Sequence, residues 1–203
     1  MRRSLFVLAV LLGGAASAAS AQTRVRLEAM TQPGTNAPLI RLSNLFDEPR
    51  WRRAMERSLP VRLHWRLQVW RSRSGWIDSP VSTHEWEVVI QREPLLEQYR
   101  LAVQLRGLRA IVRSYPSLDA LQLVYDQAQP VRGVAPTQAG EWYYRVNVDI
   151  ETLNDEDFDR MRRTTDGSDP GGIGTAVGRM LFLFGLPNDR LNAQSTIFRV
   201  GPR

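Results

Sequence analysis

Apolar and polar side chains alternate along much of the chain, and a period of two is typical of strands with one buried face. The clearest segment is 61–69, where Val61 to Val69 are apolar at odd positions and Arg62, His64, Arg66 and Gln68 are polar. Its odd positions are predicted to face a core. By the same reading, strands are expected at 23–30, 39–45, 61–69, 84–90, 98–105, 142–150 and 196–200.

Four other segments have a helical period with suitable ends. The first starts near Asp47, has Glu48 and Pro49 in its first turn, and stops at Pro60. The second is capped by Ser117. The remaining two are predicted at 155–163 and at 175–184, and whether the strongly apolar 175–184 helix is core or interface is left open.

Most predicted strands are neighbours in sequence, are joined by short turns and have one polar face. This arrangement favours antiparallel pairing over parallel strands buried on both faces. The expected class is therefore α+β: a mainly antiparallel β-sheet, with a sandwich-like arrangement as one option, and about four inserted or peripheral helices. By length, residues 22–203 are predicted to form one domain.

The segment 61–90 is predicted to be a hairpin whose apolar faces coincide. A register in which paired numbers sum to 153 places Leu67 opposite Trp86 and Trp65 opposite Val88, on the inner face. It also pairs Arg66 with Glu87 and Gln68 with Glu85, on the outer face. In this hairpin His64 faces outward and His84 inward, so the two imidazoles of the chain cannot converge on one substrate or metal.

The end of this hairpin is unusually rich in tryptophan and arginine. Trp70, Arg71, Arg73 and Trp76 fall within seven residues, and Trp70 is on the outer face by parity. Exposed tryptophan beside arginine suits a membrane interface, a glycan or a partner protein. The alternative is that other parts of the fold cover these rings. In the binding interpretation, replacing Trp70 and Trp76 together with alanine weakens binding and leaves stability nearly unchanged.

The N-terminus predicts export. Arg2 and Arg3 precede a short apolar run, and Ala19-Ser20-Ala21 is a small-x-small cleavage motif, so residues 1–21 are expected to be a signal peptide. An uncleaved anchor is the alternative, but the apolar run is far shorter than the ~20 residues that span a bilayer. The expected location is periplasmic or extracellular, with peripheral membrane association as an option and no transmembrane span after cleavage.

Composition excludes several chemistries. The chain has no cysteine, which rules out disulfides, thiol nucleophiles and thiolate metal sites. Its net charge of +6 comes from arginine alone, with acidic residues interspersed, and we expect no nucleic-acid partner. The acidic segment 153–163 is better explained as a helix with favourable ends than as a metal cluster, and the glycines of 166–178 match no nucleotide-binding motif. No metal and no cofactor are therefore expected.

Two segments resemble a known family. They are LSNLFDEPRWRRAMERSLPVRLHWRLQVWRSRSGWIDSPV and EWEVVIQREPLLEQYRL, and they are similar to the bacterial domain of unknown function 4390. Met55 and Ser58 stand where that family more often has Leu and Gly, and Arg92 and Glu93 where Tyr and Asp are common. The resemblance is good over 39–105. It implies an exported bacterial envelope protein and carries no activity or functional residues with it.

The sequence thus favours a non-enzymatic, exported cell-envelope module that binds a protein, a lipid surface or a glycan through Trp70, Arg71, Arg73 and Trp76. The alternative is a carboxylate-based periplasmic hydrolase, because the spacing of catalytic carboxylates is set in space and not along the chain. A concave pocket with converging acids would favour the enzyme. An exposed Trp and Arg surface would favour the binder.

Overall fold

The computed structural model describes residues 24–105, 107–152 and 188–202. These residues form two antiparallel sheets and two helices. The strands are β1 (Arg26–Thr31), β2 (Pro38–Ser43), β3 (Val61–Ser72), β4 (Ser79–Glu93), β5 (Gln98–Leu105), β6 (Ile111–Tyr115), β7 (Gln129–Pro130), β8 (Gly140–Thr152), β9 (Asn188–Gln194) and β10 (Phe198–Val200). The helices are α1 (Pro49–Glu56) and α2 (Leu118–Tyr125).

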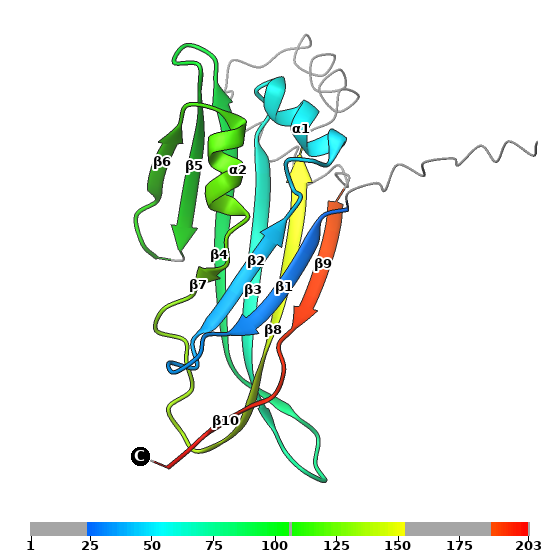
Figure 1. The fold of residues 1–203 in the computed structure, drawn as a ribbon, viewed down its shortest axis with the longest axis vertical. Coiled ribbons are helices and arrows are strands. Elements are labelled where there is room, and N and C mark those ends of the chain that lie inside the picture. Colours follow the sequence, from blue (N-terminus) through cyan, green and yellow to red (C-terminus); the bar gives the residue numbers. More distant parts are fainter. Residues whose placement is uncertain (1–23, 106, 153–187, 203) are drawn as a thin grey trace, which may run out of the picture.

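The larger sheet has the strand order β10-β8-β3-β4-β5-β6, and β9 also pairs with β8 (Figure 1). β9 and β10 follow one another along the same edge of β8. Between them, the Ser195 N–H donates to the Tyr144 carbonyl at 2.9 Å, and the Tyr144 N–H donates to Ser195 Oγ at 2.9 Å. These bonds satisfy the backbone of β8 where the strand partner changes.

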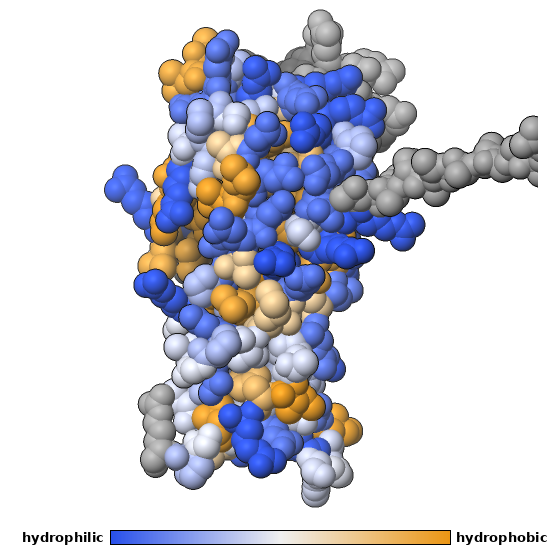
Figure 2. Space-filling view, viewed as in Figure 1, coloured by the Kyte–Doolittle hydropathy of each residue, from blue (hydrophilic) through white to orange (hydrophobic). Residues whose placement is uncertain are grey.

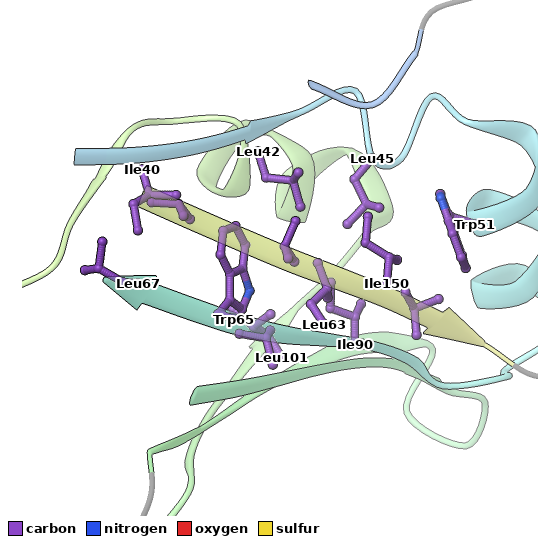
Figure 3. Close-up of a cluster of buried hydrophobic side chains, with 14 of the residues drawn as sticks. Ile40, Leu42, Leu45, Trp51, Leu63, Trp65, Leu67, Ile90, Leu101 and Ile150 are labelled. Carbon is purple, nitrogen blue, oxygen red and sulfur yellow. The ribbon is translucent and has the colours of Figure 1, made fainter. Parts of the chain in front are cut away.

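A second layer covers one face of this sheet. It consists of the small sheet β1-β2-β7 together with α1 and α2, all on the same side of β3 and β8 (Figure 1). Ile40 and Leu42 of β2 and Trp51 of α1 meet the inner residues of β3 and β8, such as Leu63 and Ile150 (Figure 3). All five are at most 4% exposed. The core therefore lies between the two layers and leaves the other face of the large sheet to solvent.

The mainly antiparallel sheet is confirmed, and so are the inner faces of its central strands. Val61, Leu63, Trp65, Leu67 and Val69 are buried, as is the predicted inner face of β8 from Trp142 to Ile150. The two packed layers are not a pure β-sandwich, because the second layer contains the helices α1 and α2 beside the small sheet. Two helices are present in the part of the chain that the structure describes, fewer than the four expected, and the helices predicted at 155–163 and 175–184 lie outside it.

The predicted hairpin register was wrong by two residues. From Val61 to Val69 the observed partners sum to 151, so Trp65 lies opposite Trp86 and Arg66 opposite Glu85, and the register shifts by one residue between Val69 and Trp70. Parity, and with it the choice of face, is unchanged, because a shift of two returns every side chain to its own side. The observed register stacks Trp65 on Trp86, with ring centroids 5.6 Å apart and planes at 4°.

Three strands escaped the sequence patterns. β6 lies in a segment to which no element was assigned, and β7 lies in a segment interpreted as a loop. β9 precedes the expected closing strand 196–200, of which only the β10 residues are extended. None of the five residues of β6 is buried, so its sequence has no apolar side to alternate. Helix α1 also begins one residue later than expected: Glu48 and not Asp47 is its N-cap, with Pro49 at the first helical position.

Candidate functional site

The β3–β4 hairpin projects beyond the rest of the sheet and ends in a loop of residues 73–78, here called the tip loop (Figure 1). Asp78 holds this loop from within. Its carboxylate accepts the Arg73 N–H at 3.0 Å and the Tyr143 hydroxyl at 3.0 Å. Burial and the bond to Asp78 both raise the pKa of Tyr143, which keeps this phenol a donor. The tip loop is thus anchored to β8.

Two of the four residues predicted for binding lie in the tip loop. Trp76 is 81% exposed, and Arg73 is also exposed. Next to them the structure places residues that the sequence argument missed: Ile77, which is 91% exposed, and Val81. The sequence contained a sign of the exposure of Ile77, because this residue directly follows Trp76 in a segment with loop-forming Ser, Gly, Asp and Pro. In Figure 2 the lower end of the molecule shows separate hydrophobic residues among polar ones.

The other two predicted residues, Trp70 and Arg71, are half-buried and join the hairpin to its neighbour. Trp70 is on the outer face and stacks on Tyr143, with centroids 6.1 Å apart and planes at 14°. The Arg145 guanidinium lies 4.2 Å from the Trp70 ring centroid. On the inner side, Arg71 lies 5.6 Å from the ring of Trp142. Trp70 and Arg71 are therefore placed to fix the base of the hairpin, not to contact a partner first.

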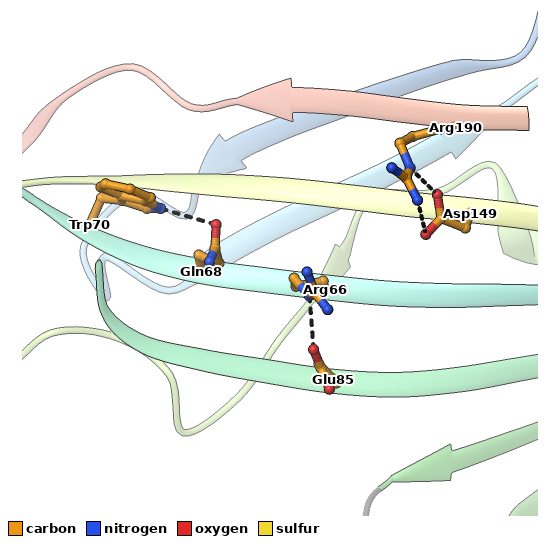
Figure 4. A network of polar contacts seen from close by, with 6 residues as sticks. All are labelled: Arg66, Gln68, Trp70, Glu85, Asp149 and Arg190. Atoms are coloured by element: carbon orange, nitrogen blue, oxygen red, sulfur yellow. Dashed lines mark hydrogen bonds and ion pairs between the residues drawn. The ribbon is translucent and has the colours of Figure 1, made fainter. Parts of the chain in front are cut away.

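A second feature is an open hollow of about 680 Å³ on the outer face of the large sheet. Three carboxylates are among the residues that line it: Glu85 and Glu87 on β4 and Asp149 on β8. Each faces a cation. Arg66 contacts Glu85 at 2.8 Å, Arg190 contacts Asp149 at 2.6 Å, and Arg62 lies 3.9 Å from Glu87. Two of these pairs are drawn in Figure 4.

These ion pairs form a ladder across neighbouring strands. Their side chains are between 27% and 68% exposed, so solvent screens these pairs and they add little to stability. The carboxylates are spread over two strands and engaged by arginine. Such a surface resembles a solvated sheet face more than a pair of catalytic acids.

The family assignment rests on the central part of the chain. A family model described as Domain of unknown function (DUF4390) matches residues 43–153. The chain belongs to the DUF4390 family. No curated protein and no solved structure gives a significant match. The matched region of this DUF4390 domain contains the whole β3–β4 hairpin and β8, so the tip loop and its anchor Tyr143 belong to the family domain.

The two histidines of the DUF4390 domain lie on opposite faces, as predicted. His64 is exposed on the outer face with Nε2 3.7 Å from Glu151, while His84 pairs with Leu67 on the inner side and contacts Ser82 at 3.2 Å. Within residues 24–105, 107–152 and 188–202, no group of three or more acidic or histidine side chains is placed to hold a metal. None of the helices described there is long and apolar enough to cross a membrane.

Proposed function

We propose that this protein is a non-enzymatic accessory module that docks on a lipid surface of the cell envelope through its tip loop. One observation supports the proposal above others: Trp76 and Ile77 are 81% and 91% exposed on a loop whose base is held by Asp78. Exposing an indole and a neighbouring isoleucine to water has no folding benefit. Their cover is therefore expected from a partner.

Shape favours a lipid surface over a protein or a glycan. A stable protein interface buries about 800 Å² on each partner, which is far more than a six-residue loop at the end of a hairpin offers. Insertion into a bilayer interface needs only a few apolar side chains, and tryptophan is enriched at that depth. Arg73 lies exposed in the same loop, where it would face anionic headgroups. A glycan would stack on an aromatic ring, but the Trp70 ring is already covered by Tyr143 and Arg145, so the tip offers only the ring of Trp76. The exposed aliphatic side chains of Ile77 and Val81 beside it suit an acyl boundary better than a sugar.

The cellular setting rests on the N-terminus. Residues 1–21 lie outside the described structure, and cleavage after Ala21 stays a prediction from the sequence. An exported protein would be periplasmic or extracellular, and tip-loop docking would make it peripheral at the membrane.

The test is vesicle binding by the double variant Trp76→Ala with Ile77→Ala. Co-sedimentation with vesicles of phosphatidylcholine and phosphatidylglycerol should fall at least about ten-fold relative to the native chain, because two anchors of roughly 2 kcal/mol each are removed. The melting temperature should change by less than about 2 °C, since both side chains are exposed.

A matched control uses Leu95 and Leu96, which are 94% and 62% exposed in the β4–β5 turn at the other end of the hairpin strands. Changing both to alanine removes comparable apolar surface and should leave vesicle binding intact. Equal loss in both double variants would show that exposed aliphatic surface in general, and not the tip loop, binds vesicles. Unchanged binding in the tip-loop variant would refute the proposal.

The second candidate is the carboxylate-based periplasmic hydrolase. The observation in its favour is the hollow on the outer face, where Glu85, Glu87 and Asp149 line one concave surface. The ion pairs of these carboxylates with Arg66, Arg62 and Arg190 weigh against a hydrolase. Each of the three carboxylates already has an arginine partner, so none is free to donate or accept a proton in catalysis.

A further inference from the structure

The strand β6 ends the large sheet with an open edge. It pairs with β5 on one side, and no strand among the described residues pairs with its other side. Ile111 and Val112 point to opposite faces, since they lie opposite Val103 and Ala102, and they are 55% and 46% exposed. An unpaired edge presents a row of free backbone N–H and C=O groups that can pair with another strand.

Exposed aliphatic side chains continue from this edge onto its surroundings. Leu105 at the end of β5, Leu108 of the β5–β6 connection, and Leu123 and Val124 of α2 are 39%, 62%, 72% and 39% exposed. α2 contacts β6, and hydrophobic surface shows along the left edge of the molecule, at β6, in Figure 2. A strand added to β6 would therefore cover apolar surface as well as satisfy backbone groups.

The charge of this region has one sign. Between Gln98 and Leu118 the sequence contains four arginines and neither aspartate nor glutamate. Arg100 pairs with Glu93 at 3.4 Å. Arg109 and Arg113 are exposed, and the structure places no carboxylate of the described residues within ion-pair distance of them. This basic strip is separate from the tip loop and lies on a different edge of the molecule (Figure 1).

We propose that β6 accepts an extended acidic segment of a partner polypeptide as an added β-strand. Only an extended polypeptide uses the edge backbone groups, the aliphatic strip and the arginines together. Acidic residues at alternate positions would lie on the face of Ile111 and Arg113, while the aliphatic residues between them would cover Val112 on the opposite face. Pairing of two copies of β6 is disfavoured, because it would bring two basic hairpins together. The site is independent of the tip loop, so the module could hold a partner while docked on a lipid surface.

The experiment uses two blocked eight-residue peptides as probes, one alternating Glu and Val and the other alternating Lys and Val. The Glu peptide should bind the native chain at least about ten-fold more tightly than the Lys peptide at low salt, and added salt should reduce the difference. On saturation, amide hydrogen exchange of residues 111–115 should slow at least about ten-fold, because the outward N–H groups gain partners. Exchange in the tip loop should not change.

The variant Arg109→Glu with Arg113→Glu makes the strip acidic and should reverse the preference between the two peptides. The variant Arg109→Gln with Arg113→Gln makes these two positions neutral and should abolish the preference. Arg26→Glu, an exposed arginine of β1, is the matched control and should preserve the native preference. Equal binding of both peptides, or binding without protection of 111–115, would overturn the proposal. Two other outcomes would also overturn it. Concentration-dependent dimerisation with protection of residues 111–115 would identify a second copy of the chain as the occupant. Vesicle binding that is lost in the Arg109/Arg113 variants but kept in the tip-loop variant would identify a lipid as the occupant.

Discussion

At the scale of single residues, Ser58 has the most informative backbone. It ends helix α1 with a φ of 63°, in the left-handed region that favours glycine. Its N–H donates to the Met55 carbonyl at 3.0 Å, and the Leu59 N–H donates to the Ala54 carbonyl at 2.9 Å. These two bonds form a Schellman motif. This geometry favours glycine at position 58.

Ser58→Gly is therefore expected to stabilise the protein. The free energy of unfolding should rise by about 0.5–1 kcal/mol, because glycine adopts a positive φ without the steric cost of a Cβ. Ser58→Ala keeps that cost and should give no gain. Denaturant titration of the three proteins measures the difference. A glycine variant no more stable than the alanine variant would mean that the helix end carries no strain.

At the scale of elements, the β3–β4 hairpin separates core from surface at successive positions. Trp65 is 6% exposed and stacked on Trp86, while Arg66, the next residue, is exposed and paired with Glu85. The two side chains belong to opposite faces of one strand. Their contributions to stability should differ accordingly.

Trp65→Ala should lower the free energy of unfolding by about 3–5 kcal/mol, because it leaves a cavity against Trp86 and the second layer. Arg66→Ala should cost under about 1 kcal/mol, since it removes only an exposed ion pair. Urea unfolding monitored by circular dichroism gives both values. Similar costs for the two variants would contradict the assignment of the faces.

At the scale of the whole molecule, closing the two layers removes tyrosine hydroxyls from water. Tyr144 of β8 is fully buried and its hydroxyl donates to the Asn36 carbonyl at 2.6 Å, which ties the large sheet to the β1–β2 connection. Burial raises the pKa of Tyr144 above its ordinary value of 10.0, and burial also raises the pKa of Tyr125 at the end of α2. Both phenols are thus held neutral in the folded state.

Stability should consequently decline in alkali. Above about pH 10 the unfolded chain loses phenol protons that the folded chain keeps, so the free energy of unfolding falls by about 1.4 kcal/mol per pH unit for each such tyrosine. Below that pH the contribution is fully present. The chain has no lysine or cysteine that would titrate in this range, so the fall in stability above pH 10 can be assigned to tyrosine. Tyr144→Phe should be less stable at neutral pH but should show a shallower slope between pH 10 and 12; an unchanged slope would exclude Tyr144 as a source.

The sequence by itself determined which side chains of β3, β4 and β8 face the core, because the side-chain period of a strand is two and needs no knowledge of partners. It also located the cap of α2: Ser117 Oγ accepts the Ala120 N–H at 3.1 Å, as its position before an amphipathic segment predicted. Such features depend on neighbours within a few residues. They can therefore be read from local order alone.

Tertiary structure decided what depends on distant partners. Parity allowed several registers for the hairpin, and the stack of Trp65 on Trp86 with the closed tip loop selected one of them. Parity also placed Trp70 on the outer face, but only the pairing of β3 with β8 brings Tyr143 and Arg145 against its ring and leaves Trp76 as the exposed tryptophan. β6 is a strand because β5 lies beside it, although no residue of β6 is buried. Cross-strand contacts join residues far apart in the chain, and periodicity along the sequence carries no information about which strands will meet.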